Sequence, residues 1–223
     1  MSLALLRPRV IGHVQDTASI LANPADYDTV LRAAVDRYSK SLPLELVADL
    51  VSTGSWDLAL PDEWQAGWSV AREVEYPIGE RKPSLVPASE RTIYATPDGP
   101  VLRLLCTTPA AGELVRLTFT VLHSIEEDAT TVPVADHNAV VLIASALACE
   151  QIASRYANKG HSTLKLDSVE QKSQSAEFAG RARQLMKLGE QLLPAQQLGE
   201  LRAAARSGRI PVPFGPLSHE RPF

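Results

Sequence analysis

Hydrophobic positions between residues 23 and 43 recur with the spacing of a helix. Asn23 is a good N-cap, Pro24 suits the first helical position, and Pro43 cannot continue a helix. Residues 1–22 show no clear period. The pattern therefore predicts a first helix from about Asn23 to Pro43, whose apolar face is made by Tyr27, Val30, Leu31, Ala34, Val35 and Tyr38.

From residue 44 the pattern changes to short apolar runs separated by proline and glycine turns. In the last run Leu117, Phe119 and Val121 alternate with polar residues, as on a strand with one buried face. Such spacing predicts a small antiparallel β module over residues 44–125. Its strand-like runs are 45–51, 68–75, 92–95, 101–106 and 115–122. The three tryptophans, Trp56, Trp64 and Trp68, all lie in it, and we interpret them as core residues rather than a stacking platform for sugars or bases.

Helical spacing returns after Pro133. Residues 139–149 carry no charge and are apolar on almost every side, which is typical of a buried helix and too short for a membrane span. A second pattern starts at a capping box around Asp167 or Ser168 and ends at Pro194. The two predict a helical hairpin within residues 126–193, with a core that includes Val140, Ile143, Leu147, Phe178 and Leu185.

Residues 194–223 carry too many prolines after position 210 for a helix or a central strand. We predict an extended C-terminal arm that docks on a partner through apolar anchors spaced along it, Ile210, Val212, Phe214, Leu217 and Phe223. The fold class is therefore α+β. Its segments are an N-terminal segment with the first helix (1–43), an inserted β module (44–125), a helical hairpin (126–193) and the arm (194–223).

Composition and motifs favour no catalytic chemistry. The 22 Lys and Arg residues against 26 Asp and Glu residues give a net charge of −4, which argues against a protein that grips nucleic acid through many phosphates. The five histidines lack metal-ligand spacing, and no nucleophile elbow or phosphate-binding loop is present. Cys106 and Cys149 form no CxxC motif, and we interpret both as small buried hydrophobic residues. We expect no enzyme activity, cofactor, metal, signal peptide or membrane span.

The order of several sequence stretches resembles the head–tail adaptor (connector or neck) proteins of long-tailed bacteriophages. The resemblance covers roughly residues 27–193, and the densest part runs from Val132 to Cys149. The other stretches that carry it are Tyr38-Ser39, 60–68, 74–79, 93–99, 101–104, Tyr156-Ala157, 161–163, 167–169, Ser173 and Ala182-Arg183.

The resemblance implies a structural role in the virion neck. Adaptors form a homo-oligomeric ring, usually of twelve copies, beneath the portal protein of the DNA-filled head. The ring extends the channel through which DNA passes without specific binding, and it offers a platform to stopper or tail proteins. Assembly would take place in the bacterial host cytoplasm without a membrane. A neighbouring subunit would help to cover the apolar helix 139–149, and the arm would dock on the portal or the adjacent subunit.

Two other functions stay open at this point. The β module departs from the smallest helical adaptors, so the protein could instead be a stopper, a tail terminator or another tail component. A domain that binds a carbohydrate or small molecule, or an unrecognised enzyme, is the alternative from a different class. Position in the particle would separate the first two roles, and a ligand titration combined with a mass measurement would identify the third.

Overall fold

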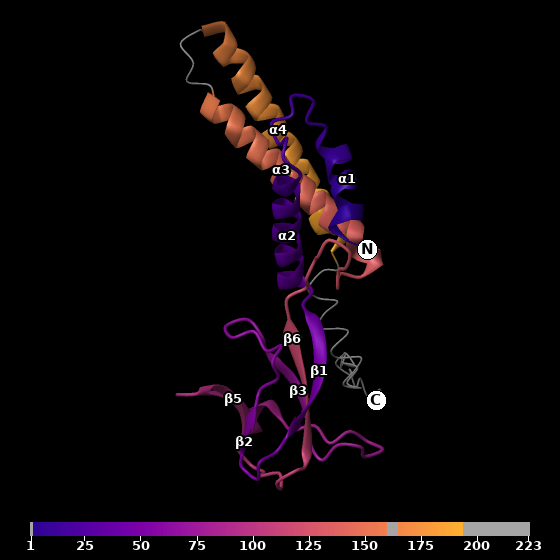
Figure 1. Ribbon diagram of the computed structural model, residues 1–223, viewed down its shortest axis with the longest axis vertical. Helices are drawn as coiled ribbons and strands as arrows, with labels where there is room; N and C mark the ends of the chain where they lie inside the picture. Colours follow the sequence, from indigo (N-terminus) through magenta and orange to yellow (C-terminus); the bar gives the residue numbers. More distant parts are fainter. Residues whose placement is uncertain (1, 160–164, 194–223) are drawn as a thin grey trace, which may run out of the picture.

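The structure is a computed structural model that describes residues 2–159 and 165–193, and it has the predicted α+β class. Four α-helices gather at one end of an elongated molecule, and two small antiparallel sheets form the other end (Figure 1). The predicted arm, with its anchors Ile210, Val212, Phe214, Leu217 and Phe223, lies outside the described residues.

Helix α1 (Leu3–Val14) was not predicted. Its apolar side chains Leu3, Leu6, Val10 and Val14 are all buried at helical spacing. Pro8 within the helix obscured this pattern, because proline normally ends or kinks a helix. Here Pro8 is exposed, and so is Ala4, whose carbonyl loses its helical N–H partner. Water can satisfy that carbonyl, which explains why the helix tolerates the proline.

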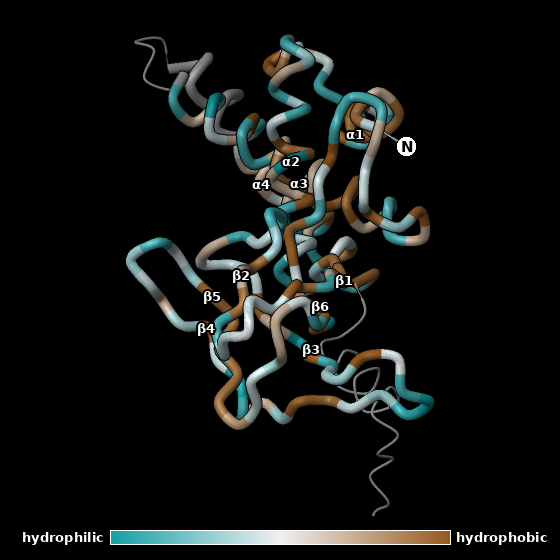
Figure 2. The backbone as a smooth tube through the Cα atoms, turned by 60° about the horizontal axis from the view of Figure 1, so that its bottom comes forward, coloured by the Kyte–Doolittle hydropathy of each residue, from teal (hydrophilic) through white to brown (hydrophobic). Residues whose placement is uncertain are grey.

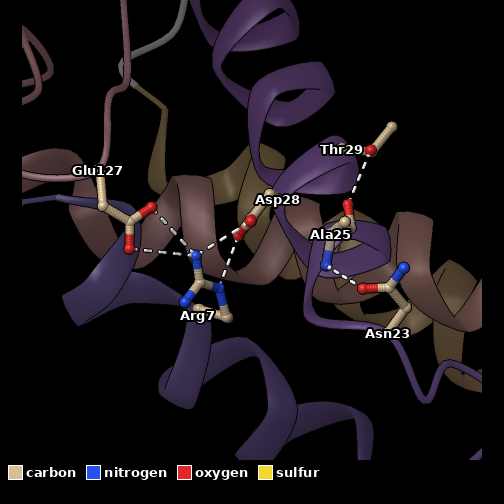
Figure 3. Close-up of polar contacts among 6 residues, drawn as sticks. All are labelled: Arg7, Asn23, Ala25, Asp28, Thr29 and Glu127. Carbon is tan, nitrogen blue, oxygen red and sulfur yellow. Dashed lines mark hydrogen bonds and ion pairs between the residues drawn. The ribbon is translucent and has the colours of Figure 1, made fainter.

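Helix α2 (Pro24–Ser41) confirms the first predicted helix. The Asn23 side chain accepts a 3.0 Å hydrogen bond from the Ala25 N–H at its N-terminus (Figure 3). Arg7 of α1 binds Asp28 of α2 through two hydrogen bonds of 2.6 and 3.0 Å, and its Nη2 also contacts Glu127 (Figure 3). This arginine therefore joins α1, α2 and the segment that precedes α3.

Helix α3 (His137–Lys159) lies at the centre of the helical layer, after the short 3-10 helix η2 (Val134–Asp136). It packs along α4 (Lys165–Leu192) as the predicted hairpin, and α1 and α2 cover more of its surface. The helix 139–149 therefore obtains cover from α1 and α2 of its own chain in addition to α4, and a contact with a neighbouring subunit stays a prediction. Helix α4 begins at Lys165, so the predicted caps Asp167 and Ser168 lie within its first turn.

The β module contains two three-stranded sheets in which every strand pair is antiparallel. The first sheet has the order β1-β6-β3 and the second the order β2-β5-β4. The strands are β1 (Leu44–Val51), β2 (Asp57–Ala59), β3 (Ala71–Glu75), β4 (Arg91–Thr96), β5 (Gly99–Leu104) and β6 (Leu114–Val121), and the 3-10 helix η1 (Ala88–Glu90) precedes β4. The short strand β2 was not predicted.

Each end of the molecule has its own hydrophobic core. Leu117 and Phe119 of β6 are buried with Leu58, Val74 and Leu102 of neighbouring strands, as the alternation of β6 predicts. The helical core is a separate cluster made by α1, α2, α3 and α4. The proposed boundaries at residues 43 and 125, like independent folding of the β module, stay predictions.

Within the described ranges, one helical segment is long and apolar enough to cross a membrane by length and composition alone. It is Val134–Asn158, and 67% of its most apolar window is buried inside the fold. The sequence pattern had indicated only the charge-free residues 139–149 within this segment, which are too short to span a membrane. The segment is the central helix of the bundle described above, and a core helix passes the same test.

Candidate functional site

The two ends of the molecule meet at a buried polar junction. The Ser39 hydroxyl near the end of α2 donates to the Val35 carbonyl at 2.8 Å and accepts a 2.9 Å hydrogen bond from the His123 N–H. Ser39 is fully buried. His123 lies two residues beyond Val121, the last residue of β6. Because a buried N–H must be paired, this contact fixes how the chain leaves the β module toward α3.

The aromatic ring of Tyr38 extends the junction. Its hydroxyl donates a 2.7 Å hydrogen bond to Asp136, and its ring meets the His123 imidazole edge-on at 5.1 Å between centroids. The His123 Nδ1 lies 3.1 Å from the Thr131 hydroxyl. Burial lowers the pKa of His123 below its ordinary value of 6.5, so the neutral imidazole is favoured. The junction is therefore a packed and hydrogen-bonded connection between the two cores.

Ion pairs cross the outer faces of both sheets. In the first sheet Arg116 binds Asp49 at 2.8 Å and lies 3.7 Å from Glu75, which ties together β1, β6 and β3. In the second, Arg103 binds Asp57 at 2.6 Å and stacks over the Tyr94 ring. The hydrogen bonds from these arginines lower the pKa of Asp49 and Asp57. Such cross-strand pairs are structural, since each charge already has a partner.

An open pocket of about 400 Å³ lies between the segment after β2 and the tip of the β4–β5 hairpin. Trp64 and Pro61 line one side, and Asp98 and Pro100 line the other. Asp98 is the one ionisable side chain in the lining. The lining mixes polar and apolar surface, and its Thr96 hydroxyl donates to the Gly99 carbonyl at 2.7 Å.

No group of three or more His, Cys, Asp or Glu side chains that could hold a metal occurs among the residues that the structure describes. His123 and His137 are both buried, and the Nε2 of His137 lies 3.1 Å from the Val132 carbonyl. The imidazole of His137 is therefore held by the turn that precedes α3.

The predicted hairpin residues lie together at the interface of α3 and α4. Val140 and Ile143 are fully buried. Leu147, Phe178 and Leu185 are partly buried against the same core. Leu192 is 53% exposed because it lies at the end of α4.

Two expectations about buried side chains are wrong in part. Trp56 is 58% exposed, whereas Trp64 packs against Phe119 in the β core and Trp68 is half-buried. Cys106 is exposed because it follows the end of β5, while Cys149 is buried within α3. A pattern of apolar neighbours could not distinguish a strand end from a strand centre.

Similarity to known proteins is found among solved structures. No protein-family model and no curated protein matches the sequence. A structure described as the "Neck of empty GTA particle computed with C6 symmetry" aligns with 64% of this chain and 76% of its own chain, at 20% sequence identity and a TM-score of 0.29.

Proposed function

We propose that this protein is a structural component of a phage-like virion neck, and that it assembles as a homo-oligomeric ring between the portal and the tail. The ring, of twelve copies if it follows the adaptors, extends the DNA channel of the head. The proposal rests first on the sequence: the order of several stretches resembles that in head–tail adaptors. Its support in the fold is the junction of Ser39 and His123, which joins a helical layer to a β module in one fixed orientation.

A ring subunit needs such a fixed shape. Two ends that rotated freely about a linker would not repeat the same contact from copy to copy, and closed rings require that repeat. The junction buries Ser39 and His123 and adds the hydrogen bond between Tyr38 and Asp136. The connection from α2 to β1 is only Leu42 and Pro43, which leaves little freedom between the two ends.

The charges of the described residues suit a channel through which DNA slides. Strong DNA binding requires arginines and lysines that are available to phosphates. Here several arginines are instead bound to carboxylates of the same chain, namely Arg7, Arg37, Arg103, Arg116 and Arg155. In this proposal DNA passes through the ring without specific binding, and the protein is a structural part rather than an enzyme.

The experiment that tests the proposal is a mass measurement of the purified protein, combined with projection images of the protein and of assembled particles. A closed ring in the images and its position between portal and tail are the expected results. A protein that stays a monomer at every concentration and in the presence of portal, and that is absent from the neck of particles, would rule the proposal out.

The β module supports one alternative within the same particle. A stopper or tail terminator would also form a ring, but it would lie farther from the portal. A β-rich end with open strand edges is suited to contact several kinds of neighbour. Localisation of the chain in a map of the whole neck distinguishes these positions, because only the adaptor contacts the portal directly.

The pocket beside Trp64 supports a second alternative, a ligand-binding domain. Its volume of about 400 Å³ is within the range of small-molecule sites. Titration with sugars and nucleotides, monitored through the fluorescence of Trp64, tests this role. A saturable ligand and a monomeric mass would favour it over the ring, and Trp64→Ala would then abolish the binding.

A further inference from the structure

The outer edge of β4 is an open strand edge within the described residues. β4 pairs with β5 on one side and is the last strand of its sheet. Four consecutive residues, Thr92 to Ala95, are exposed, which means that both faces of the strand reach solvent. Figure 2 shows the β4–β5 hairpin projecting at the margin of the molecule, away from β1. Such an edge is a template for another strand.

Two of the other three sheet edges, those of β3 and β2, are protected. β3 has a bulge between Ala71 and Glu73, and the segment that follows pairs with it through a 2.8 Å hydrogen bond from the Val86 N–H to the Val74 carbonyl. β2 has only three residues. Bulges, covering segments and short strands all limit edge pairing. Among the described strands, this leaves β1 and β4 as the two long open edges.

The register shows which β4 groups face the open edge. The Leu105 N–H donates to the Glu90 carbonyl, so position 90 faces β5. Backbone N–H and C=O groups alternate between the two edges of a strand. Those of Thr92 and Tyr94 therefore also point to β5, and those of Arg91, Ile93 and Ala95 point to the open edge. Pro100, which has no N–H, lies opposite Ala95 and fits this alternation. The open edge of β4 therefore offers the backbone groups of residues 91, 93 and 95.

One of the outward positions, Ile93, continues the hydrophobic core of the module, whereas Arg91 donates from its Nη2 to the Arg72 carbonyl at 2.6 Å. Ile93 lies opposite Leu102, which in turn lies opposite Leu58, and both leucines are buried. Ile93 itself is 38% exposed, so the core face of the sheet is left incomplete at β4. A strand added here would cover Ile93 if its own inward side chains were apolar.

The edge of β1 has the opposite character. The Ser52 N–H donates to the Glu113 carbonyl, which by the same alternation directs Glu45, Val47 and Asp49 to the open edge of β1. The side chains of these three residues are exposed on the outer face. An added strand would place its paired side chains in solvent beside two carboxylates. An apolar strand is therefore better accommodated at β4.

The chain contains a sequence that matches the β4 edge. Residues 210–214 read Ile-Pro-Val-Pro-Phe, and the prolines at 211 and 213 have no N–H. In an extended segment alternate residues point to opposite edges, so every remaining N–H, from Ile210, Val212 and Phe214, points to one edge. Such a sequence can only join a sheet as its last strand. It would bring three apolar side chains to one face.

We propose that residues 210–214 of a neighbouring copy add to the open edge of β4 as a further strand, with Val212 beside Ile93. The apolar side chains of the arm then cover the incomplete core, and the prolines lie on the outer face near Tyr94. The choice of a neighbouring copy rests on the proposed ring. When the arm of one copy binds the β4 edge of the next copy, two different surfaces meet in a head-to-tail contact. Such a contact can repeat from copy to copy and close into a ring. Residues 194–209 can span on the order of 50 Å when extended, which suffices to reach another copy.

Disulfide trapping between two different copies tests this contact. Both copies carry Cys106→Ser, which removes the exposed native thiol. The acceptor copy carries Ile93→Cys and lacks residues 208–223, and the donor copy carries Val212→Cys on the full chain. Oxidised glutathione is added to the mixture, and the product is resolved by mass. We expect a disulfide-linked pair of one acceptor and one donor.

The matched control places the acceptor cysteine at Tyr94, whose side chain lies on the opposite face of β4. We expect the yield of linked pairs to fall at least tenfold with Tyr94→Cys. Equal yields, or no link from either position, would overturn the proposal. A single chain that carries both Ile93→Cys and Val212→Cys, and that links only within itself, would show that the arm covers its own edge, which overturns the neighbouring copy as occupant.

The ring and the arm contact can fail separately. A closed ring by mass without a link between residues 93 and 212 overturns the arm contact and leaves the proposed function intact. If the disulfide forms between copies but the protein never assembles into a closed ring, the proposed ring is overturned. A second variant, Val212→Pro, removes the N–H that faces β4 but keeps the arm extended. It should lower trapping of a donor Phe214→Cys by the acceptor cysteine opposite it, Arg91→Cys or Ala95→Cys, at least fivefold. Val212→Ala, which keeps that N–H, should lower it less.

Discussion

The hydroxyl of Ser39 accepts a hydrogen bond from the backbone N–H of His123 at 2.9 Å, where both residues are buried between the two hydrophobic cores. Ser39 belongs to α2 and His123 follows β6, so the contact joins the start and the end of the inserted β module. The same hydroxyl donates to Val35 within its own helix. A single small side chain therefore satisfies groups on both sides of the junction.

Ser39→Ala should destabilise the protein because it leaves the buried His123 N–H without a partner. The expected loss is about 1–3 kcal/mol, since an unpaired buried donor costs the full desolvation of that group. For a chain of this size the melting temperature should fall by roughly 3–10 °C. Ser154→Ala, at an exposed position of α3, is the control and should leave the melting temperature nearly unchanged. Equal stability of the two variants would show that the junction hydrogen bond is unimportant.

Stability should decrease below about pH 6.5 because His123 is buried with a lowered pKa. The unfolded chain binds a proton at His123 near pH 6.5, whereas the folded protein binds it only at lower pH, so acidification favours the unfolded state. The decrease lies above the range in which Asp49 and Asp57, with lowered pKa values, lose their contribution. Denaturant unfolding between about pH 7.5 and pH 5 measures the effect.

The control for this pH dependence is the exposed His13 at the end of α1. His123→Gln should flatten the dependence between pH 5 and pH 6.5, while His13→Gln should leave it as in the parent protein. A parent profile that is flat across this interval would contradict the assignment of His123 as a buried neutral imidazole.

The sequence predicted most of the elements because their patterns are local. Asn23 and Pro24 mark the start of α2, and the alternation of Leu117, Phe119 and Val121 marks the buried face of β6. Helix α1 was missed because Pro8 is a local signal against a helix, whereas its cost depends on whether the freed carbonyl reaches water. The cover that α1 gives to α3 was missed for the same reason.

The junction could not be predicted because its residues are far apart in the chain. Ser39 and His123 carry no motif, and serine is mostly exposed in folded proteins while histidine is intermediate. Trp56 and Cys106 were predicted to be buried but are exposed, because local apolar composition does not reveal where a strand ends. The arm anchors, among them Val212 and Phe214, were predicted from spacing, and the open edge of β4 emerged only from the order of the strands.

The two cysteines should differ in reactivity. Burial raises the pKa of the Cys149 thiol to about 11, and its side chain is inaccessible, whereas Cys106 is exposed. In the folded protein at about pH 8, a disulfide reagent should modify Cys106 alone, because the thiolate is the reactive form. Cys106→Ser should remove this reaction, and unfolding in guanidinium should restore one reactive thiol. Rapid modification of Cys149 in the folded variant would contradict its burial in α3.

Gly189 and Gly180, both in α4, should respond to alanine with opposite signs. A Cβ at Gly189 would lie 2.8 Å from the Ile143 Cγ1, 3.2 Å from the Ile143 N and 3.3 Å from the Ala139 carbonyl. Two of these neighbours are backbone atoms of α3, so the helices would have to separate, at a cost of about 1–3 kcal/mol. A Cβ at Gly180 would meet nothing within 4 Å, so Gly180→Ala should stabilise the helix by about 0.5–1 kcal/mol.

Thermal and denaturant unfolding of the two variants measure this difference directly. Gly180→Ala reports the intrinsic preference of a helix for alanine, and Gly189→Ala contains the same gain together with the loss of close packing. We therefore expect Gly189→Ala to melt below the parent protein and Gly180→Ala at or above it. If both variants were stabilised alike, α3 and α4 would not approach as closely at Ala139 and Ile143 as the fold requires.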